Sequence, residues 1–396
     1  MMVQPVPGHS LERGFGLYIH WPFCRAKCPY CDFNSHVAAD VDYPRFAAAF
    51  HREMAHMAAQ YGTGRPLSSL FFGGGTPSLM PPELVAGIIR TADDLFGLAP
   101  DVEITAEANP TSAEAGMFAG FAAAGVNRLS LGVQSLRDEG LLFLGREHSA
   151  DEALAALGQA EHHFRRLSID LIYARKDQTI DGWKDEIRQA LDLGITHMSV
   201  YQLTIEPGTV FFTRARRGEV LTMDDDHAAD LFEATNQIMA EAGLPAYEIS
   251  NHAKPGEECR HNLTYWRAGD WIGVGPGAHG RMDMHGGRRG LATRRSPASW
   301  LEQVETEGHG IETILEDGTG DAVAEALMMG LRLAEGVDLA ALSDRFDDLT
   351  LHIDMAAHDR LIANRLLAAE AGTLRVTRQG RLVLNRILAE LLITAT

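Results

Sequence analysis

Three of the four cysteines of this chain lie in one short segment, where they could together bind a metal centre. Cys24, Cys28 and Cys31 have the spacing C-x3-C-x2-C. Thiolates are soft ligands that select zinc, Cu(I) or iron–sulfur clusters. A closed zinc site takes four protein ligands, whereas a cubane [4Fe–4S] cluster on three cysteines keeps one iron open. That iron could chelate an amine and a carboxylate, the groups at the methionine end of S-adenosylmethionine (SAM).

A zinc loop is the alternative interpretation of the same segment. It would combine the three cysteines with His20 or His36 as the fourth ligand. A protein that holds stoichiometric zinc, with no iron or sulfide, would establish this alternative.

The composition is that of an ordinary water-soluble protein large enough for two domains. The chain has 396 residues, of which 45% are hydrophobic and 22% charged. No signal peptide and no run of eighteen apolar residues is evident, and the few, clustered cysteines favour a reducing compartment. We therefore expect a cytoplasmic protein without a membrane span. The formal net charge of -19 opposes binding to nucleic acid.

Strands that alternate with helices follow the cysteine segment. Short apolar runs predict six strands, at residues 16–20, 68–72, 102–107, 128–133, 167–172 and 197–203. Helical patterns lie between and after them, at residues 43–60, 82–96, 112–124, from 149, 183–193 and 224–242. Ser149 and Glu152 form a predicted capping box. This order predicts an α/β fold with a partial (β/α)6 barrel.

Chemistry in such barrels lies at the C-terminal ends of the strands. The polar or glycine residues at those ends are the cysteine loop, Gly73 to Thr76, Glu107, Gln134 and Asp170. We expect them to converge on one site. The glycines would let the backbone approach a ligand without a Cβ clash. Each motif also has a purely structural interpretation, as a glycine turn, a solvated acid or a buried ion pair.

Two further groups could contact ligands. Arg146 could clamp a carboxylate in a bidentate manner, or form a surface ion pair. His261, Tyr265 and Trp266 form a polar and aromatic cluster that suits a porphyrin, because imidazole is a usual haem ligand. A structural loop with packed aromatic residues is the alternative. The remote Cys259 is interpreted as a core residue.

The chain is expected to divide into three parts: a barrel at residues 1–245, a loop-rich extension at 246–315, and a small C-terminal domain at 316–396. Residues 373–377 and 381–384 flank Gln379-Gly380, which predicts a hairpin and a winged-helix-like unit. Four nearby arginines also raise a weaker hypothesis of nucleic-acid binding, against the overall acidity: Arg375, Arg378, Arg381 and Arg386.

Taken together, these motifs resemble the oxygen-independent coproporphyrinogen III oxidase family of radical-SAM proteins, and within it the HemW-type haem chaperone branch. The resemblance spans Tyr18 through the C-terminal domain. The motifs that carry it are Y-x-H-x-P-F-C at 18–24, C-P-Y-C-D-F at 28–33, G-G-G-T-P at 73–77, E-A-N-P at 107–110, G-V-Q-S at 132–135, G-R-E-H at 145–148, D-L-I-Y at 170–173 and H-N-x-x-Y-W at 261–266.

The resemblance implies that Cys24, Cys28 and Cys31 hold a [4Fe–4S] cluster. It implies SAM contacts from Tyr18, Tyr30, Gly74, Gly75, Thr76, Glu107, Gln134, Arg146 and Asp170, and haem contacts from His261, Tyr265 and Trp266. The family usually has Gly-Leu-Pro after D-L-I-Y, whereas this chain has Ala174-Arg175-Lys176, so that turn is expected to differ.

Two features separate the branches of this family. The oxidases carry another cysteine two residues after the third, where this chain has Phe33, and they have a longer N-terminal extension. The resemblance therefore implies a haem chaperone that delivers haem to an acceptor protein. The alternative is a radical-SAM oxidase that converts coproporphyrinogen III to protoporphyrinogen IX.

Overall fold

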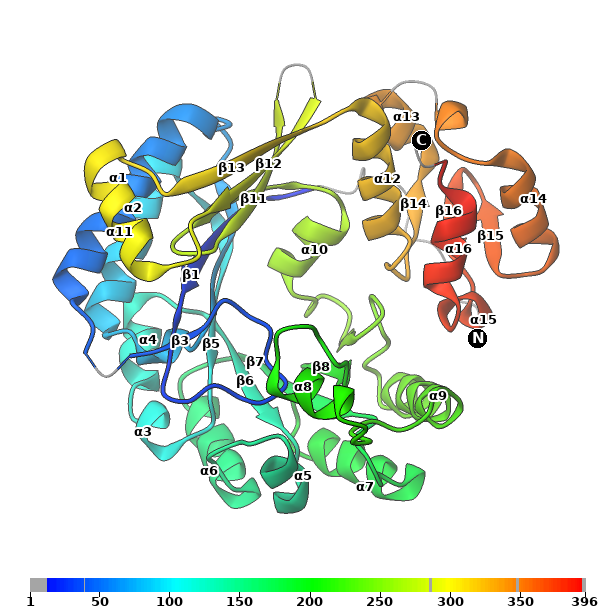
Figure 1. Ribbon diagram of the computed structural model, residues 1–396, viewed down its shortest axis with the longest axis horizontal. Helices are drawn as coiled ribbons and strands as arrows, with labels where there is room; N and C mark the ends of the chain where they lie inside the picture. The colour runs from blue at the N-terminus through cyan, green and yellow to red at the C-terminus, as the bar shows by residue number, and fades with distance from the viewer. Residues whose placement is uncertain (1–12, 39, 285–286, 347–348, 394–396) are drawn as a thin grey trace.

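Six parallel strands form the centre of the molecule, as the alternating pattern predicts. The computed structural model describes residues 13–38, 40–284, 287–346 and 349–393 of the chain. The strands, in their order across the sheet, are β1 (Phe15–Trp21), β4 (Leu67–Gly74), β5 (Leu98–Ala108), β6 (Arg128–Gln134), β7 (Arg166–Tyr173) and β8 (His197–Gln202). All neighbouring pairs among them are parallel. The sheet curves into an open barrel with helices on its outside (Figure 1).

Helices cover the outside of the sheet, and one of them begins at the predicted capping box. They are α1 (Tyr43–Tyr61), α2 (Pro82–Phe96), α3 (Ser112–Ala115), α4 (Phe118–Ala124), α5 (Asp138–Phe143), α6 (Ala150–Glu161), α7 (Ile180–Leu191), α8 (Val210–Arg216) and α9 (Asp225–Glu241). The predicted capping box of Ser149 and Glu152 is present at α6. One difference is that the helix predicted over 112–124 is two short helices, interrupted at Gly116-Met117.

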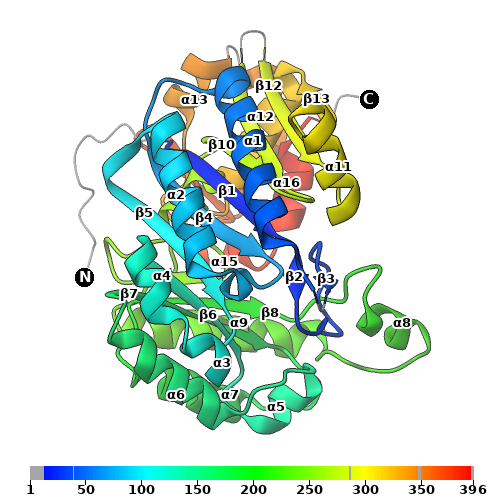
Figure 2. The same cartoon turned by 90° about the vertical axis from the view of Figure 1, so that its left-hand side faces the viewer.

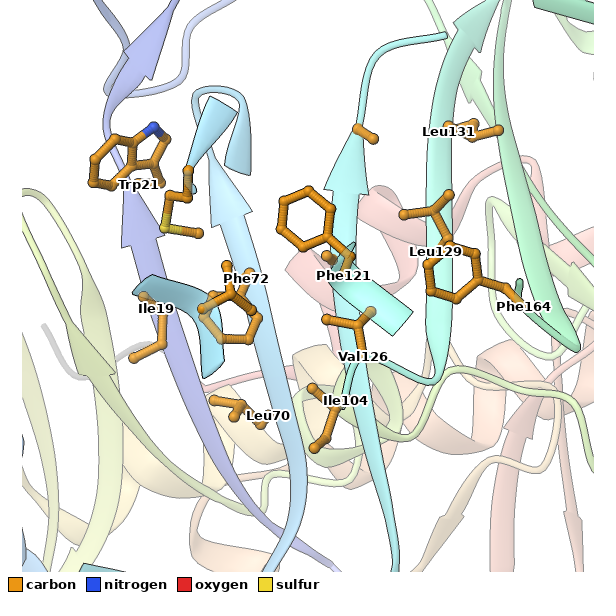
Figure 3. Close-up of a cluster of buried hydrophobic side chains, with 14 of the residues drawn as sticks. Ile19, Trp21, Leu70, Phe72, Ile104, Phe121, Val126, Leu129, Leu131 and Phe164 are labelled. Carbon is orange, nitrogen blue, oxygen red and sulfur yellow. The ribbon is translucent and has the colours of Figure 1, made fainter. Parts of the chain in front are cut away.

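The main hydrophobic core lies between the sheet and these helices. The apolar residues of each strand point outward into it, as Figure 3 shows for Ile19 and Trp21 of β1 and for Leu70 and Phe72 of β4. All four are fully buried. Burial of each such side chain contributes about 1.5–3 kcal/mol to the stability of the fold, so this layer holds the outer helices against the sheet.

The inner face of the sheet is polar and aromatic. Because side chains alternate along a strand, the residues between the core residues point into the barrel. On β1 these are Gly16, Tyr18 and His20, and on β5 they include Glu103 and Glu107. The chemistry-bearing side chains therefore share the inside of the barrel.

Residues 246–315 contain more regular structure than the predicted loop-rich extension. They form β9 (Asn251–Ala253), α10 (Arg260–Trp266), β10 (Asp270–Val274), β11 (His279–Met284), β12 (Gly287–Thr293), α11 (Pro297–Glu307) and β13 (Ile311–Asp317). These strands join both edges of the central sheet, which has eleven strands among the described residues. β10 pairs in parallel with β1, and α10 lies inside the curve of the sheet (Figure 1).

The C-terminal region packs around a second hydrophobic core. Its elements are α12 (Thr319–Gly330), β14 (Val337–Asp338), α13 (Leu339–Phe346), α14 (Met355–Ala363), β15 (Leu367–Glu370), β16 (Thr373–Val376), α15 (Arg378–Arg381) and α16 (Leu384–Leu391). The predicted hairpin around Gln379-Gly380 is wrong. The hairpin joins β15 to β16 through Ala371-Gly372, and residues 378–381 are helical, with Thr377 as the N-cap.

The described part of the chain contains no helix that is both long and apolar enough to cross a membrane.

The C-terminal arginines are less available to bind nucleic acid than the sequence suggests. Arg375 pairs with Glu370 and Arg386 with Glu390, at N···O distances of 2.6 and 2.7 Å. These ion pairs weaken the case for a basic nucleic-acid surface.

Candidate functional site

A cavity of about 430 Å³ opens at the C-terminal edge of the six central strands. Its volume is within the range of small-molecule sites. The predicted residues that line it are Cys24, Cys28, Tyr30, Cys31, Gly74, Gly75, Thr76, Glu107, Gln134, Arg146 and Asp170. The structure thus brings five strand ends together, as the barrel rule predicts. Tyr18 is the exception, because it lies beneath the cavity and bonds to His20 through its hydroxyl, at 3.1 Å.

The cysteine loop leaves β1 and is held at the mouth of the barrel. Short strands β2 (Phe23–Cys24) and β3 (His36–Val37) pair at its two ends. Phe211, at the start of α8, donates its backbone N–H to the Pro29 carbonyl at 2.9 Å, and α8 projects beside the loop (Figure 2). All three thiols are free and partly exposed. They are therefore positioned by backbone contacts and available to a ligand.

Two side chains donate hydrogen bonds to these sulfurs. Thr76 Oγ1 lies 3.3 Å from Cys24 Sγ, and Arg146 Nη1 lies 3.3 Å from Cys28 Sγ. Burial raises the pKa of the Cys24 and Cys31 thiols. Cluster binding requires thiolates, and both a cationic donor and the bound metal favour them. The donor set therefore fits an iron–sulfur cluster on three cysteines.

The zinc alternative loses one of its two proposed fourth ligands, His20. His20 Nε2 lies 2.9 Å from the Asn34 carbonyl oxygen, which can only accept, so Nε2 carries the proton. The remaining nitrogen, Nδ1, accepts from the Tyr18 hydroxyl. Burial lowers the pKa of His20 to about 4, which keeps the ring neutral. Within the described residues, no group of three or more His, Cys, Asp or Glu side chains could hold a single metal ion.

The glycines of G-G-G-T-P serve the cysteine loop directly. Gly75 donates its N–H to the Trp21 carbonyl at 2.7 Å, and Thr76 donates to the Phe23 carbonyl at 2.8 Å. A Cβ on Gly75 would lie 2.7 Å from the Phe23 oxygen, and Gly74 has a φ of 110°. The sequence predicts that these glycines let the backbone approach a ligand closely. In the structure they first allow β4 to pack against the start of the cysteine loop.

Glu107 and Asp170 face the cavity, and neither forms an ion pair with a cation among the described residues. Burial, and then repulsion from Asp170, raises the pKa of Glu107 to about 8, against one hydrogen bond from the Gly74 amide. Burial likewise raises the pKa of Asp170 to about 6, although Ser130 Oγ lies 3.3 Å away. The Ser199 and Ser130 hydroxyls offset only part of the desolvation of Asp170, so ionising both acids is costly unless a ligand neutralises them. SAM fits this requirement, because it carries a sulfonium and an ammonium group.

Arg146 connects the cluster side of the cavity to the strand ends. Its Nη2 donates to the Gly132 carbonyl at 3.0 Å and to Asn109 Oδ1, while its Nε is buried without a partner in the described structure. Asn109 also donates to Thr76 Oγ1 at 3.2 Å. Asn109 was not among the predicted site residues, although it lies in the quoted E-A-N-P motif.

The turn after β7, which carries Ala174-Arg175-Lys176, supports the site. Ala174 has a φ of 61°, and the Arg175 guanidinium is buried. Arg175 Nη2 lies 3.1 Å from Glu186 Oε2, and Glu186 Oε1 accepts from the Leu136 amide at 2.8 Å. This pair fixes the turn that follows Gln134. Neither Arg175 nor Glu186 was predicted as a site residue, because no motif indicates a contact between β7 and α7.

The predicted site residues include none from the end of the sixth strand, β8. Residues that extend the cavity wall there are Tyr201, Gln202, Leu203, Thr204 and Glu206. The barrel rule applied to β8 as to the other five strands, so the signal was available. Phe33 lies at the cavity too, with 60% of its surface exposed.

His261 of the H-N-x-x-Y-W motif is enclosed by the protein in this structure. His261 is 1% exposed. Its Nδ1 lies 2.8 Å from Ser69 Oγ and its Nε2 lies 2.5 Å from the Tyr265 hydroxyl. Both ring nitrogens are therefore engaged, and the iron of a haem has no access to either. Trp266 is partly buried, and its indole N–H has no partner in the described structure.

Comparisons with known proteins give a consistent picture. The model of the radical SAM superfamily matches residues 18–190, and that of the HemN C-terminal domain matches residues 320–383. The chain is 38% identical to the heme chaperone HemW of Escherichia coli, over 94% of this chain and 96% of that protein. It is 37% identical to the mouse mitochondrial radical S-adenosyl methionine domain-containing protein 1, over 98% of this chain and 90% of that protein.

The solved structure of coproporphyrinogen III oxidase (HemN) from Escherichia coli, a radical SAM enzyme, is similar in fold. Its TM-score is 0.79 at 23% identity, and the match covers 96% of this chain and 90% of that one. At this identity the likeness supports the fold of both the barrel and the C-terminal region.

Proposed function

We propose that this chain, which belongs to the HemW family of radical-SAM proteins, is a haem chaperone. It would bind haem and pass it to an acceptor protein. The full-length similarity to the heme chaperone HemW supports this function. Within the structure, the observation that carries it is Phe33. An exposed apolar ring stands at the cavity where the resemblance places an additional cysteine in the oxidases.

In this proposal Cys24, Cys28 and Cys31 hold a [4Fe–4S] cluster. When bound, the cluster supplies an iron with an open coordination site and an electron for SAM. Thr76 and Arg146 stabilise the thiolates through their hydrogen bonds to Cys24 and Cys28. Burial of the sulfurs on the barrel side limits the access of water to them.

The remaining cavity residues orient SAM. Glu107 and Asp170 favour its positive groups electrostatically, and an acid such as Asp170 can accept from ribose hydroxyls. Arg146 still has its Nε available for a carboxylate. The other residues proposed to contact SAM are Tyr30, Gly74, Gly75, Thr76 and Gln134. Tyr18 would act indirectly, because it supports the cavity from below.

The acceptor is proposed to be a protein that takes up haem as its prosthetic group. An anaerobic titration of the cluster-loaded protein with haem, followed by mixing with an apo-haem protein such as apomyoglobin, tests binding and transfer together. We expect saturable binding and transfer, with no conversion of coproporphyrinogen III to protoporphyrinogen IX when SAM and a reductant are supplied. Turnover without stable haem binding would instead establish the oxidase function.

A further inference from the structure

The helix α10, which carries H-N-x-x-Y-W, is built into the inside of the barrel. Its N-terminal end is held by Glu103, whose Oε1 accepts the Arg260 amide at 2.8 Å. The same carboxylate lies 3.3 Å from Arg128 Nη1 and 3.0 Å from an Arg166 nitrogen. A buried carboxylate with three donors fixes the helix firmly to β5 and its neighbours.

His261 links this helix to the two strands that lead into the site. Its ring stacks on Phe71 of β4, with centroids 5.1 Å apart, and on Tyr18 of β1, at 6.2 Å. Its Nδ1 bonds to Ser69, also on β4. Burial lowers the pKa of His261 to about 3, so the neutral ring donates one hydrogen bond and accepts the other.

The contacts of His261 lie directly beneath the cofactor cavity. A Cβ on Gly73 would lie 2.9 Å from the Tyr18 ring, so Tyr18 packs against the start of G-G-G-T-P. β1 continues into the cysteine loop, and β4 continues into Gly74 and Gly75. A displacement of His261 would therefore move both strand ends that form the cavity floor.

The other end of α10 contacts the C-terminal region. Arg267 Nε lies 2.8 Å from Glu335 Oε1, and Ala268 is buried within the second hydrophobic core. The Arg332 guanidinium lies 6.0 Å from the Trp266 ring centroid. Figure 1 shows α10 between the barrel and α12. One short helix thus touches the floor of the cavity and the C-terminal core.

We propose that the H-N-x-x-Y-W helix is a brace that positions the SAM cavity and ties it to the C-terminal region, and that His261 is a positioning residue rather than a ligand of haem iron. The inference rests on the proposed haem and SAM binding. It assigns the motif to the protein's own structure, because both ring nitrogens of His261 already have protein partners.

The test compares variants that affect the brace with one that cannot. Ser69→Ala removes a partner of His261 and leaves the imidazole in place, whereas His261→Asn removes the imidazole and keeps a hydrogen-bonding group. His163→Ala, at an exposed histidine beyond α6, is the matched control. SAM affinity is measured by equilibrium dialysis of the cluster-loaded protein. Haem binding is measured by the position and amplitude of the Soret band.

We expect Ser69→Ala and His261→Asn to weaken SAM binding by up to about tenfold, the factor set by one lost buried hydrogen bond. The haem spectrum and stoichiometry should match wild type in both, as in the control. Unchanged SAM affinity in both variants would overturn the proposal, as would a shifted Soret band in His261→Asn alone. If His261→Asn binds neither SAM nor haem, the SAM affinity of Ser69→Ala decides whether the brace positions the cavity.

A failure of the proposed function is recognisable separately. If the wild-type protein binds no haem, the chaperone function fails. The SAM affinities of Ser69→Ala and His261→Asn, together with hydrogen exchange at residues 69–76, still report on the brace. Faster exchange in that segment supports it, and exchange equal to wild type contradicts it.

Discussion

Two glutamates on the inner face of one strand are compensated in opposite ways. Glu103 and Glu107 are four residues apart on β5 and face the inside of the barrel. Glu103 has an ion pair with Arg128, another with Arg166, and a hydrogen bond from the Arg260 amide. Glu107 has a single hydrogen bond from the Gly74 amide, and its pKa is raised to about 8 by burial and by Asp170.

The difference separates a structural region from a binding region within the same barrel. Around Glu103 and His261, polar atoms are mostly paired within the protein, and the elements they join are fixed. Around Glu107, charges and donors lack protein partners, including the Arg146 Nε. A protein tolerates such uncompensated groups where a ligand supplies the missing interactions. Charge compensation of the carboxylate, rather than residue type, therefore distinguishes Glu107 at the cavity from Glu103 at the brace.

The largest expected effect is on cluster binding. It is tested by comparing the cysteines of the cavity with Cys259 at the brace. Cys24→Ala, Cys28→Ala or Cys31→Ala should each abolish stable cluster binding, because a cubane loses one of its three protein ligands. Cys259→Ala should retain the cluster, since Cys259 is buried beside the brace at 3% exposure. Iron and sulfide analysis after reconstitution measures both. Equal loss in Cys259→Ala would mean that the two regions are not distinct.

The next prediction exchanges the two glutamates for glutamine. Glu103→Gln should destabilise the barrel by about 3–5 kcal/mol, because it leaves Arg128 buried without its counter-charge. Glu107→Gln should be neutral or stabilising in the ligand-free protein, since it removes a poorly compensated acid, while SAM affinity falls. Denaturant unfolding and SAM dialysis of both variants give the two readouts. Similar stability losses at both positions would contradict the division.

The pH dependence sharpens the same comparison. The folded-state pKa of Glu107 is raised from 4.5 to about 8, so the folded protein binds more protons than the unfolded chain in that window. Stability of the ligand-free protein should therefore fall as pH rises between these values. SAM affinity should rise over the same window, because the ionised carboxylate attracts its positive groups. Asp170, with a pKa of about 6, adds to both trends.

The measurement is a thermal unfolding and SAM-binding series between about pH 4 and about pH 9, values that bracket the window. In Glu107→Gln the upper part of both slopes should disappear. A SAM affinity that is flat in the wild-type protein would show that the acids of the cavity do not meet a cation.

Local signals predicted the fold and much of the candidate site. The six central strands follow from short apolar runs, and the strand ends then follow from the geometry of parallel barrels. The position of α10 could not be predicted in this way. Its contacts join His261 to Ser69, which is 192 residues earlier, and nothing in the local pattern encodes that pairing. The motif was consequently interpreted as a ligand site.

The hairpin of the C-terminal region shows a different kind of error. Both Gln379-Gly380 and Ala371-Gly372 lie between apolar segments, and the predicted hairpin was placed at Gln379-Gly380. Thr377 decides against it, because its side chain accepts the Gly380 amide at 3.0 Å and so begins a helical turn. At Ala371 and Gly372 the φ angles are 50° and 83°, which a two-residue hairpin turn requires.

That turn gives the smallest prediction, in a region remote from both glutamates. An alanine at positive φ is strained, whereas Asn-Gly is the preferred pair for such a turn, so Ala371→Asn should stabilise the C-terminal region by about 0.5–1 kcal/mol. Thermal unfolding should show a small increase in the midpoint, with SAM affinity unchanged. If SAM affinity also changes, a substitution in the C-terminal region alters the cavity, which a fixed brace would not allow. The C-terminal region and the cavity are then coupled rather than separate.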